Sequence, residues 1–210
     1  MLFQLIQIRS ILDVILSSLL ISGYFFIVIA GVINLKREEK LKSSIFFTII
    51  GAVEILYEFL KWRLYNSIIV IFSEPNLLIV QLNYAILWII PYIISILTFG
   101  VLTIILAKRN KENSGKRLLL SGIFWIIPTS ILLVINIYGF FPVAQPVAVI
   151  FGNISIFVTL FMVVSRIFLL LYSVRIKEKN LLIASIFLMI ASIVFTFYTA
   201  IDFIINTFIF

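Results

Sequence analysis

The sequence predicts an all-α fold, a polytopic transmembrane helical bundle of about six spans that forms a single domain over residues 1–210. Its 210 residues are 63% hydrophobic and 12% charged, against roughly 45–50% and about 25% in a soluble domain. The mean hydropathy is +1.26. A soluble chain of this length could not bury so much apolar surface, because small domains keep a large surface relative to their volume. The lipid bilayer is therefore the expected partner, and the charged residues gather in short segments between apolar runs.

The apolar runs define the spans, because about 20 such residues cross roughly 30 Å of hydrocarbon. The predicted spans cover about residues 14–35, 43–63, 81–107, 118–138, 150–173 and 181–202. The first is interpreted as a permanent span, since the residues before Arg9 lack the basic-first order of a secretory signal. Residues 64–80 contain the turn signal Ser73-Glu74-Pro75-Asn76 and are interpreted as a loop lying partly in the membrane interface, with a further crossing as the alternative.

Three basic segments follow the first, third and fifth spans, at residues 36–42, 108–117 and 175–180. They hold 12 of the 16 Lys and Arg residues, whereas the opposite side has only Arg9, Lys61 and Arg63. Because cytoplasmic loops of membrane proteins carry the excess of Lys and Arg, the basic loops are predicted to be cytoplasmic and both termini outside the cell membrane. The net charge of +7 does not indicate a nucleic-acid partner, since that would need a broad basic face in a polar context.

The sequence contains two repeat patterns, and they imply different arrangements of the spans. Similar Ile/Phe-rich strings at residues 44–50, 122–127 and 185–190 each follow a basic segment, which would fit three tandem helical hairpins. Chance similarity is the favoured explanation, because Ile and Phe are the ordinary filler of a span. The string Trp-Ile-Ile-Pro occurs at both 88–91 and 125–128, in spans of opposite direction. Inverted repeats are typical of transporters, but a three-plus-three arrangement would pair span three with span six, so this match does not fit.

The chain has no cysteine and no histidine. Their absence excludes disulfides, thiolate nucleophiles, iron–sulfur clusters, Cys/His zinc sites and histidine-ligated haem, so no cofactor and no metal site is predicted. An enzyme is the least supported class, because an active site needs convergent reactive groups and only Glu54 and Glu58 come together in the sequence.

The candidate intramembrane polar site consists of Glu54, Glu58 and Arg166. Glu54 lies about 16 Å into the second span, near the middle of the membrane, and Glu58 follows one turn later on the same face. Arg166 precedes Arg175 by nine residues, which places it at a similar depth, roughly 13 Å from the membrane boundary. We hypothesise a Glu54–Arg166 pair. It would be either structural or part of a transport or proton-handling path, and Arg166 extending to the interface is the remaining alternative.

Pro91 and Pro128 are the predicted helix kinks. Each removes a backbone hydrogen bond and frees the carbonyl four residues earlier, at Leu87 and Phe124. Such a carbonyl needs a neighbour or water in the membrane, so the kinks would either line a cavity or adjust helix packing.

The leading functional interpretation is a small ion, proton or solute transporter with carboxylate-gated passage of a cation along the Glu54 face. It requires that Glu54 and Arg166 line a water-accessible cavity. The alternative is a non-catalytic membrane subunit or scaffold, which would present a flat apolar face without a cavity. A homo-oligomer or other membrane subunits as partners are left open.

Overall fold

The computed structural model describes residues 2–35, 41–71, 89–109, 113–139 and 145–209. Among them only Lys177 and Glu178, in the turn between the last two helices, are not helical. The predicted all-α bundle is therefore confirmed. The helices are α1 (Leu2–Leu35), α2 (Leu41–Ile71), α4 (Ile90–Ser95), η3 (Ile96–Leu102), α5 (Thr103–Arg109), α6 (Asn113–Gly139), α7 (Gln145–Ile176) and α8 (Lys179–Ile209).

Five helical segments of the described chain are long and apolar enough to cross a membrane. They are Gln4–Asn34, Tyr92–Arg109, Gly115–Tyr138, Val149–Ile176 and Lys179–Ile205. The second of these runs through α4, η3 and α5, which follow one another without a break. Large apolar side chains cover the outside of the bundle, for example Val14 at 66% and Phe157 at 62% exposure. Such a surface suits lipid, and these helices fit a multi-pass membrane protein.

α2 runs to Ile71, so the prediction that the loop begins at residue 64 is wrong. The physical reason lies in the sequence, because residues 64–71 contain no glycine or proline that would end a helix. The turn signal that suggested a loop begins only at Ser73, outside the described residues. Whether residues 64–80 cross the membrane stays untested.

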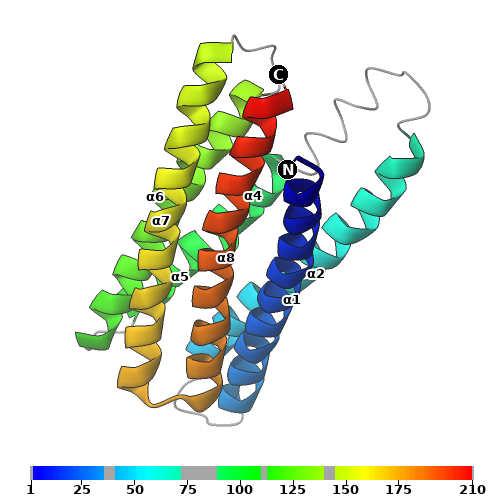
Figure 1. Ribbon diagram of the computed structural model, residues 1–210. Helices are drawn as coiled ribbons and strands as arrows, with labels where there is room; N and C mark the ends of the chain where they lie inside the picture. Colours follow the sequence, from blue (N-terminus) through cyan, green and yellow to red (C-terminus); the bar gives the residue numbers. More distant parts are fainter. Residues whose placement is uncertain (1, 36–40, 72–88, 110–112, 140–144, 210) are drawn as a thin grey trace.

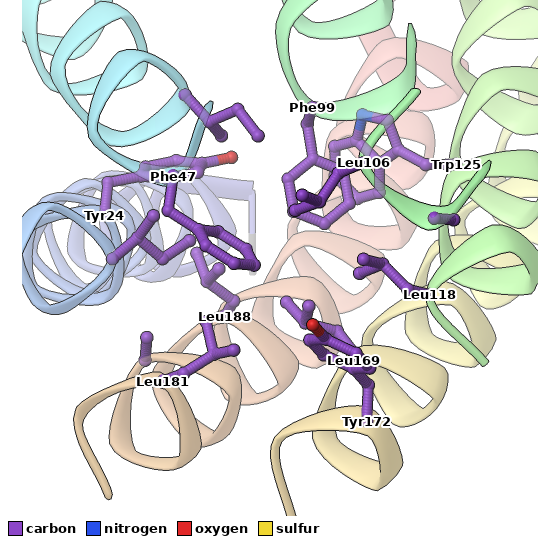
Figure 2. Packing of buried hydrophobic residues seen from close by; sticks show 14 of the residues in the cluster. Tyr24, Phe47, Phe99, Leu106, Leu118, Trp125, Leu169, Tyr172, Leu181 and Leu188 are labelled. Atoms are coloured by element: carbon purple, nitrogen blue, oxygen red, sulfur yellow. The ribbon is translucent and has the colours of Figure 1, made fainter. Parts of the chain in front are cut away.

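The helices form a closed ring in the order α2, α1, α8, α7, α6 and the α4–η3–α5 segment, and a contact between η3 and α2 completes it (Figure 1). Helices next to each other in the sequence are also in contact, in the pairs α1–α2, α5–α6 and α7–α8. These pairs make three antiparallel hairpins. Figure 2 shows the core that they enclose, with Phe99, Leu106 and Trp125 gathered on one side and Tyr24 and Phe47 on the other.

The ends of α1, α5 and α7 and the starts of α2, α6 and α8 lie at one end of the bundle, and the start of α1 and the end of α8 lie at the other (Figure 1). We call these the basic end and the terminal end. Lys108 and Arg109 form the last turn of α5, and Arg175 lies in the last turn of α7. A single membrane side for the three basic loops remains a prediction, and so does the assignment of that side to the cytoplasm.

The two predicted kinks differ in their surroundings. Pro91 lies in the first turn of α4, where a proline removes no hydrogen bond of the described helix. Leu87, whose carbonyl would be freed, lies outside the described residues, so a kink at Pro91 stays a prediction. Pro128 lies inside α6, which continues from Asn113 to Gly139 with the proline side chain fully buried.

Glycines let α1 and α2 approach closely. A Cβ atom on Gly51 would lie 2.7 Å from the Tyr24 carbonyl oxygen, and one on Gly31 would lie 2.8 Å from the Ser44 carbonyl oxygen. Helices in lipid associate through such close packing, because no hydrophobic effect drives them together there. The backbone of Tyr24 therefore lies directly against α2 at Gly51.

We expect Gly51→Val to lower the free energy of unfolding by about 1–3 kcal/mol, the usual range for overpacking. The added side chain would push α2 away from the Tyr24 backbone, which offers no flexible atom to move aside. Thermal unfolding of the detergent-solubilised protein measures the effect. Ala52→Val is the matched control, since Ala52 is exposed one position later on the same helix. Equal melting temperatures for the two variants would contradict the packing role of Gly51.

Candidate functional site

A partly open cavity of about 150 Å³ lies within the bundle. Six helices contribute to its wall, namely α1, α2, α4, α6, α7 and α8. The lining residues are Leu16, Leu20, Tyr24, Glu54, Tyr57, Glu58, Tyr92, Ser95, Trp125, Thr129, Met162, Ala191, Ser192 and Phe195. On α1 they begin at Tyr24, about 16 Å from the basic end of the helix, and extend about 12 Å further toward the terminal end. The cavity therefore reaches from the middle of the bundle toward the terminal end.

Glu54 and Glu58 stand one helical turn apart on α2, and both belong to the cavity wall. Their exposed fractions are only 4% and 6%. The hydroxyl of Thr98 donates a hydrogen bond to Oε1 of Glu54, which ties α2 to η3. Two acidic side chains thus face one small space inside the bundle.

η3 is a π-helix, which the sequence did not predict. Its hydrogen bonds run from residue i to residue i+5, so its turns are wider than those of an α-helix. Three consecutive residues, Thr98, Phe99 and Gly100, are buried. Thr98 reaches Glu54, Phe99 reaches Arg166, and Gly100 packs against the Ile126 side chain of α6. Because the turn is wider, adjacent residues can all pack inside the bundle. π-Helical turns occur frequently at functional sites.

Arg166 is completely buried, at 0% exposure. Its Cζ atom lies 3.9 Å from the centre of the Phe99 ring and 3.8 Å from that of Trp125. Its Nη2 donates a hydrogen bond of 3.1 Å to the hydroxyl of Tyr24. Within the described part of the chain, its Nε and Nη1 atoms have no hydrogen-bond partner. Aromatic faces therefore supply most of the contacts of this buried cation, and such contacts stabilise by about 2 kcal/mol or more when water is excluded.

The hypothesised ion pair between Glu54 and Arg166 is not formed. Glu54 accepts its hydrogen bond from Thr98, and Arg166 donates to Tyr24 instead. The two charges nevertheless share one buried cluster, in which each acts electrostatically on the other. Arg166 also does not extend to the membrane interface, since the rings of Phe99 and Trp125 hold it inside the bundle.

Only part of the sequence-based site lines the cavity. Glu54 and Glu58 lie in the wall as the transport interpretation requires, whereas Arg166 stands behind Tyr24 and Trp125, which line it. Arg166 lies ten residues from the basic end of α7, about 15 Å, which is the depth at which the cavity ends. Its charge therefore lies just behind the wall at the end of the cavity nearer the basic end.

The aromatic residues of the site were not predicted from the sequence, and neither was an ion pair at the terminal end. Arg9 Nη2 lies 2.9 Å from Asp202 Oδ1, which joins α1 to α8, and Arg9 Nε donates to the hydroxyl of Tyr198 at 3.3 Å. The pair is about one-third exposed and water competes with it, so it orders the terminal end more than it stabilises the fold. Nothing in the sequence could identify partners 193 positions apart.

The site thus combines two buried carboxyl groups and aromatic rings with a buried positive charge behind the wall at one end. Carboxylate oxygens and the faces of aromatic rings both attract cations. Comparison with known protein families, with curated proteins and with solved structures finds no match to this chain, so its function has to be inferred from the cavity itself.

Proposed function

We propose that this multi-pass protein moves a small cation across the membrane by way of the cavity at Glu54 and Glu58. The observation that carries the proposal is a partly open space in the bundle with two carboxyl groups in its wall. Ionisable groups at this depth are costly in a membrane, and they generally face a pathway or a substrate. A scaffold subunit would have no need for a cavity with acidic walls.

The two ends of the cavity suggest how passage is controlled. A cation entering from the terminal end would meet Glu58 first and Glu54 next, since Glu54 lies one turn nearer the basic end. Beyond Glu54 stands the guanidinium of Arg166, which lies against the rings of both Phe99 and Trp125. A fixed positive charge in a narrow pathway opposes the passage of cations. In this proposal, the arrangement is a state open toward the terminal end, and transport requires Arg166 and its two rings to move apart.

Charge movement in reconstituted vesicles tests the proposal. The purified protein in proteoliposomes on a solid-supported membrane should give a current when the concentration of H⁺, Na⁺, K⁺ or an ammonium ion is raised. We expect the Glu54→Gln/Glu58→Gln double variant to lower the current at least tenfold, because it removes both negative charges from the wall. The control is Glu178→Gln, which removes a carboxylate from the α7–α8 turn, outside the cavity. No current with any of these ions, or an equal current in the double variant, would reject cation transport and favour the subunit interpretation.

We further propose that the basic end faces the cytoplasm of the cell, as the excess of Lys and Arg predicts. Since the chain has no cysteine, single cysteines can report sidedness without background. In intact cells, a membrane-impermeant maleimide should label Gln4→Cys at the terminal end and leave Lys179→Cys unlabelled until the cells are opened. Both positions are exposed in the bundle, so they differ in side and not in burial. The reverse labelling pattern would invert the proposed topology.

A further inference from the structure

We infer that the cation is a small organic ammonium ion, such as a quaternary ammonium or a compact amine, and not a bare inorganic ion. The inference rests on the proposed function, because it names the substrate class of the same cavity. Three features carry it: the size of the cavity, the apolar part of its wall, and the distribution of hydrogen-bond donors and acceptors around it.

The size of the cavity fits a molecule of several heavy atoms. Its volume is about 150 Å³, and apolar cavities on the order of this volume accept a benzene-sized ligand in other proteins. An unhydrated metal ion would leave most of the space empty. A tetramethylammonium head group is close to the size of such a ligand and carries its charge at the centre.

Most of the surface of the wall is apolar and cannot coordinate a metal ion. Leu16, Leu20, Met162, Ala191 and Phe195 offer no oxygen atoms from their side chains. Hard metal cations such as Mg²⁺ and Ca²⁺ need six or more oxygen ligands when they lose their water. In the described part of the chain, no group of three or more Asp, Glu, His or Cys side chains could hold a metal. Methyl and methylene groups of an organic cation would instead pack against this apolar wall.

The polar part of the wall presents acceptors. The Trp125 indole N–H is bound to the Ser95 hydroxyl at 3.0 Å. The hydroxyls of Thr129 and Ser192 donate to backbone carbonyls of their own helices, at 2.5 and 3.0 Å. These three donors are engaged within the protein, whereas the Tyr57 hydroxyl has no partner among the described residues and can still donate. The two carboxyl groups of α2 make the wall acidic, so it favours a ligand with positive charge over an anion.

Aromatic rings in the wall can bind an organic cation, and one of them already binds a cationic side chain of the protein. Tyr24, Tyr57, Tyr92 and Trp125 all line the cavity. The Trp125 ring binds an organic cation of the chain itself, the Arg166 guanidinium, at 3.8 Å from the ring centre. Aromatic rings grouped around a small space are the usual recognition site for quaternary ammonium groups.

A pair of isosteric ligands tests the substrate class on the unmodified protein. Choline and 3,3-dimethylbutan-1-ol have almost the same shape, but only choline carries a positive charge. Isothermal titration of the full chain in lipid nanodiscs should show saturable binding of choline and of tetramethylammonium. The neutral alcohol should bind at least tenfold more weakly. Equal binding of choline and the alcohol would overturn the inference, because the cavity would then recognise shape alone.

Variants of Tyr57 test the aromatic contribution. The Tyr57 hydroxyl has no hydrogen-bond partner among the described residues, so Tyr57→Phe removes a group that nothing in the site uses. We expect this variant to bind tetramethylammonium as the unmodified protein does. Tyr57→Leu removes the ring and should weaken binding about fivefold, as expected for one cation–π contact. Equal affinity of the Phe and Leu variants would overturn the aromatic part of the inference.

Competition by metal ions separates this inference from the proposed function. Displacement of tetramethylammonium by Na⁺ or K⁺ at equal concentration would assign the cavity to inorganic ions and overturn the inference, although cation transport would stand. Vesicle currents with metal ions but no ammonium binding would overturn the inference in the same way. Ammonium binding without any current would keep the substrate class and reject transport.

Discussion

Glu54→Gln should weaken the binding of tetramethylammonium by about 10- to 100-fold while leaving the fold intact. The amide has the shape of the carboxylate, and its oxygen can still accept the hydrogen bond from Thr98. The variant loses the negative charge of Glu54, a residue that is only 4% exposed. Interactions with a charged partner are worth about 1.5–3 kcal/mol, and each 1.4 kcal/mol is a factor of ten in affinity.

Thr98→Val is the companion variant, because it keeps the shape of the threonine and removes its hydroxyl. The Glu54 carboxylate would keep its charge but lose its hydrogen bond to η3, so its position would become less defined. We expect a loss of affinity of no more than about fivefold, smaller than that of Glu54→Gln, since a neutral hydrogen bond contributes only about 1 kcal/mol. Titration calorimetry of both variants, with their melting temperatures as a check on folding, measures the difference. An affinity within twofold of the unmodified protein for Glu54→Gln would remove this residue from the site.

The charged members of the site could be found from the sequence because they interrupt apolar runs. Glu54, Glu58 and Arg166 are conspicuous where nearly every neighbour is Ile, Leu or Phe. Counting residues from the ends of the spans also gave useful depths, since a helix rises by about 1.5 Å per residue. All three residues lie in the interior of the bundle, at 6% exposure or less.

The partners of these residues could not be predicted, because the direction in which a membrane helix faces leaves little trace in its sequence. Lipid is as apolar as the protein core, so a helix in a membrane is hydrophobic all around. Phe99 and Trp125 are ordinary apolar residues in the sequence, yet both of their rings lie against Arg166. Depth and opposite charge suggested that Glu54 and Arg166 are in contact. In the structure, Glu54 accepts a hydrogen bond from Thr98, and Arg166 donates one to Tyr24. These contacts depend on which helices are neighbours, and the sequence does not show which helices pack together.

The π-helix shows a second limit. The sequence predicted a kink at Pro91 in this span, and the structure has an irregular stretch further along, at Ile96–Leu102. A π-helical turn has no characteristic amino-acid composition. Its only trace in the sequence is the small residue Gly100, which fits against Ile126. The irregular stretch brings both Thr98 and Phe99 to the site.

Arg166→Ala should have the largest effect on stability of any single substitution in the cavity region. It removes a completely buried side chain that touches Phe99, Trp125 and Tyr24. Truncation of a large buried side chain to alanine costs about 2–5 kcal/mol because of the void that it leaves. We expect a loss of about 3 kcal/mol in the free energy of unfolding, within that range, measured by denaturant titration in mixed micelles.

Arg166→Met separates the volume of the side chain from its charge. Methionine fills much of the same space, packs well against aromatic rings and carries no unpartnered N–H groups. Two guanidinium nitrogens of Arg166 have no partner within the described structure, and leaving buried donors unsatisfied is costly. The methionine variant should therefore lose less than half of the stability that the alanine variant loses. A loss as large as that of alanine would mean that the charge itself stabilises the bundle.

The same variant tests whether Arg166 blocks the basic end of the cavity. Without the guanidinium, the cluster beside the cavity loses its buried positive charge, so the electrostatic barrier to cations falls. Proteoliposomes with Arg166→Met should pass ammonium ions down their gradient at least tenfold faster than those with the unmodified protein. Arg166→Lys keeps a positive charge but loses the planar group that lies against the two rings, so it should leak less than methionine. If methionine and lysine leaked equally, the rings of Phe99 and Trp125 would form the barrier, and the charge of Arg166 would not.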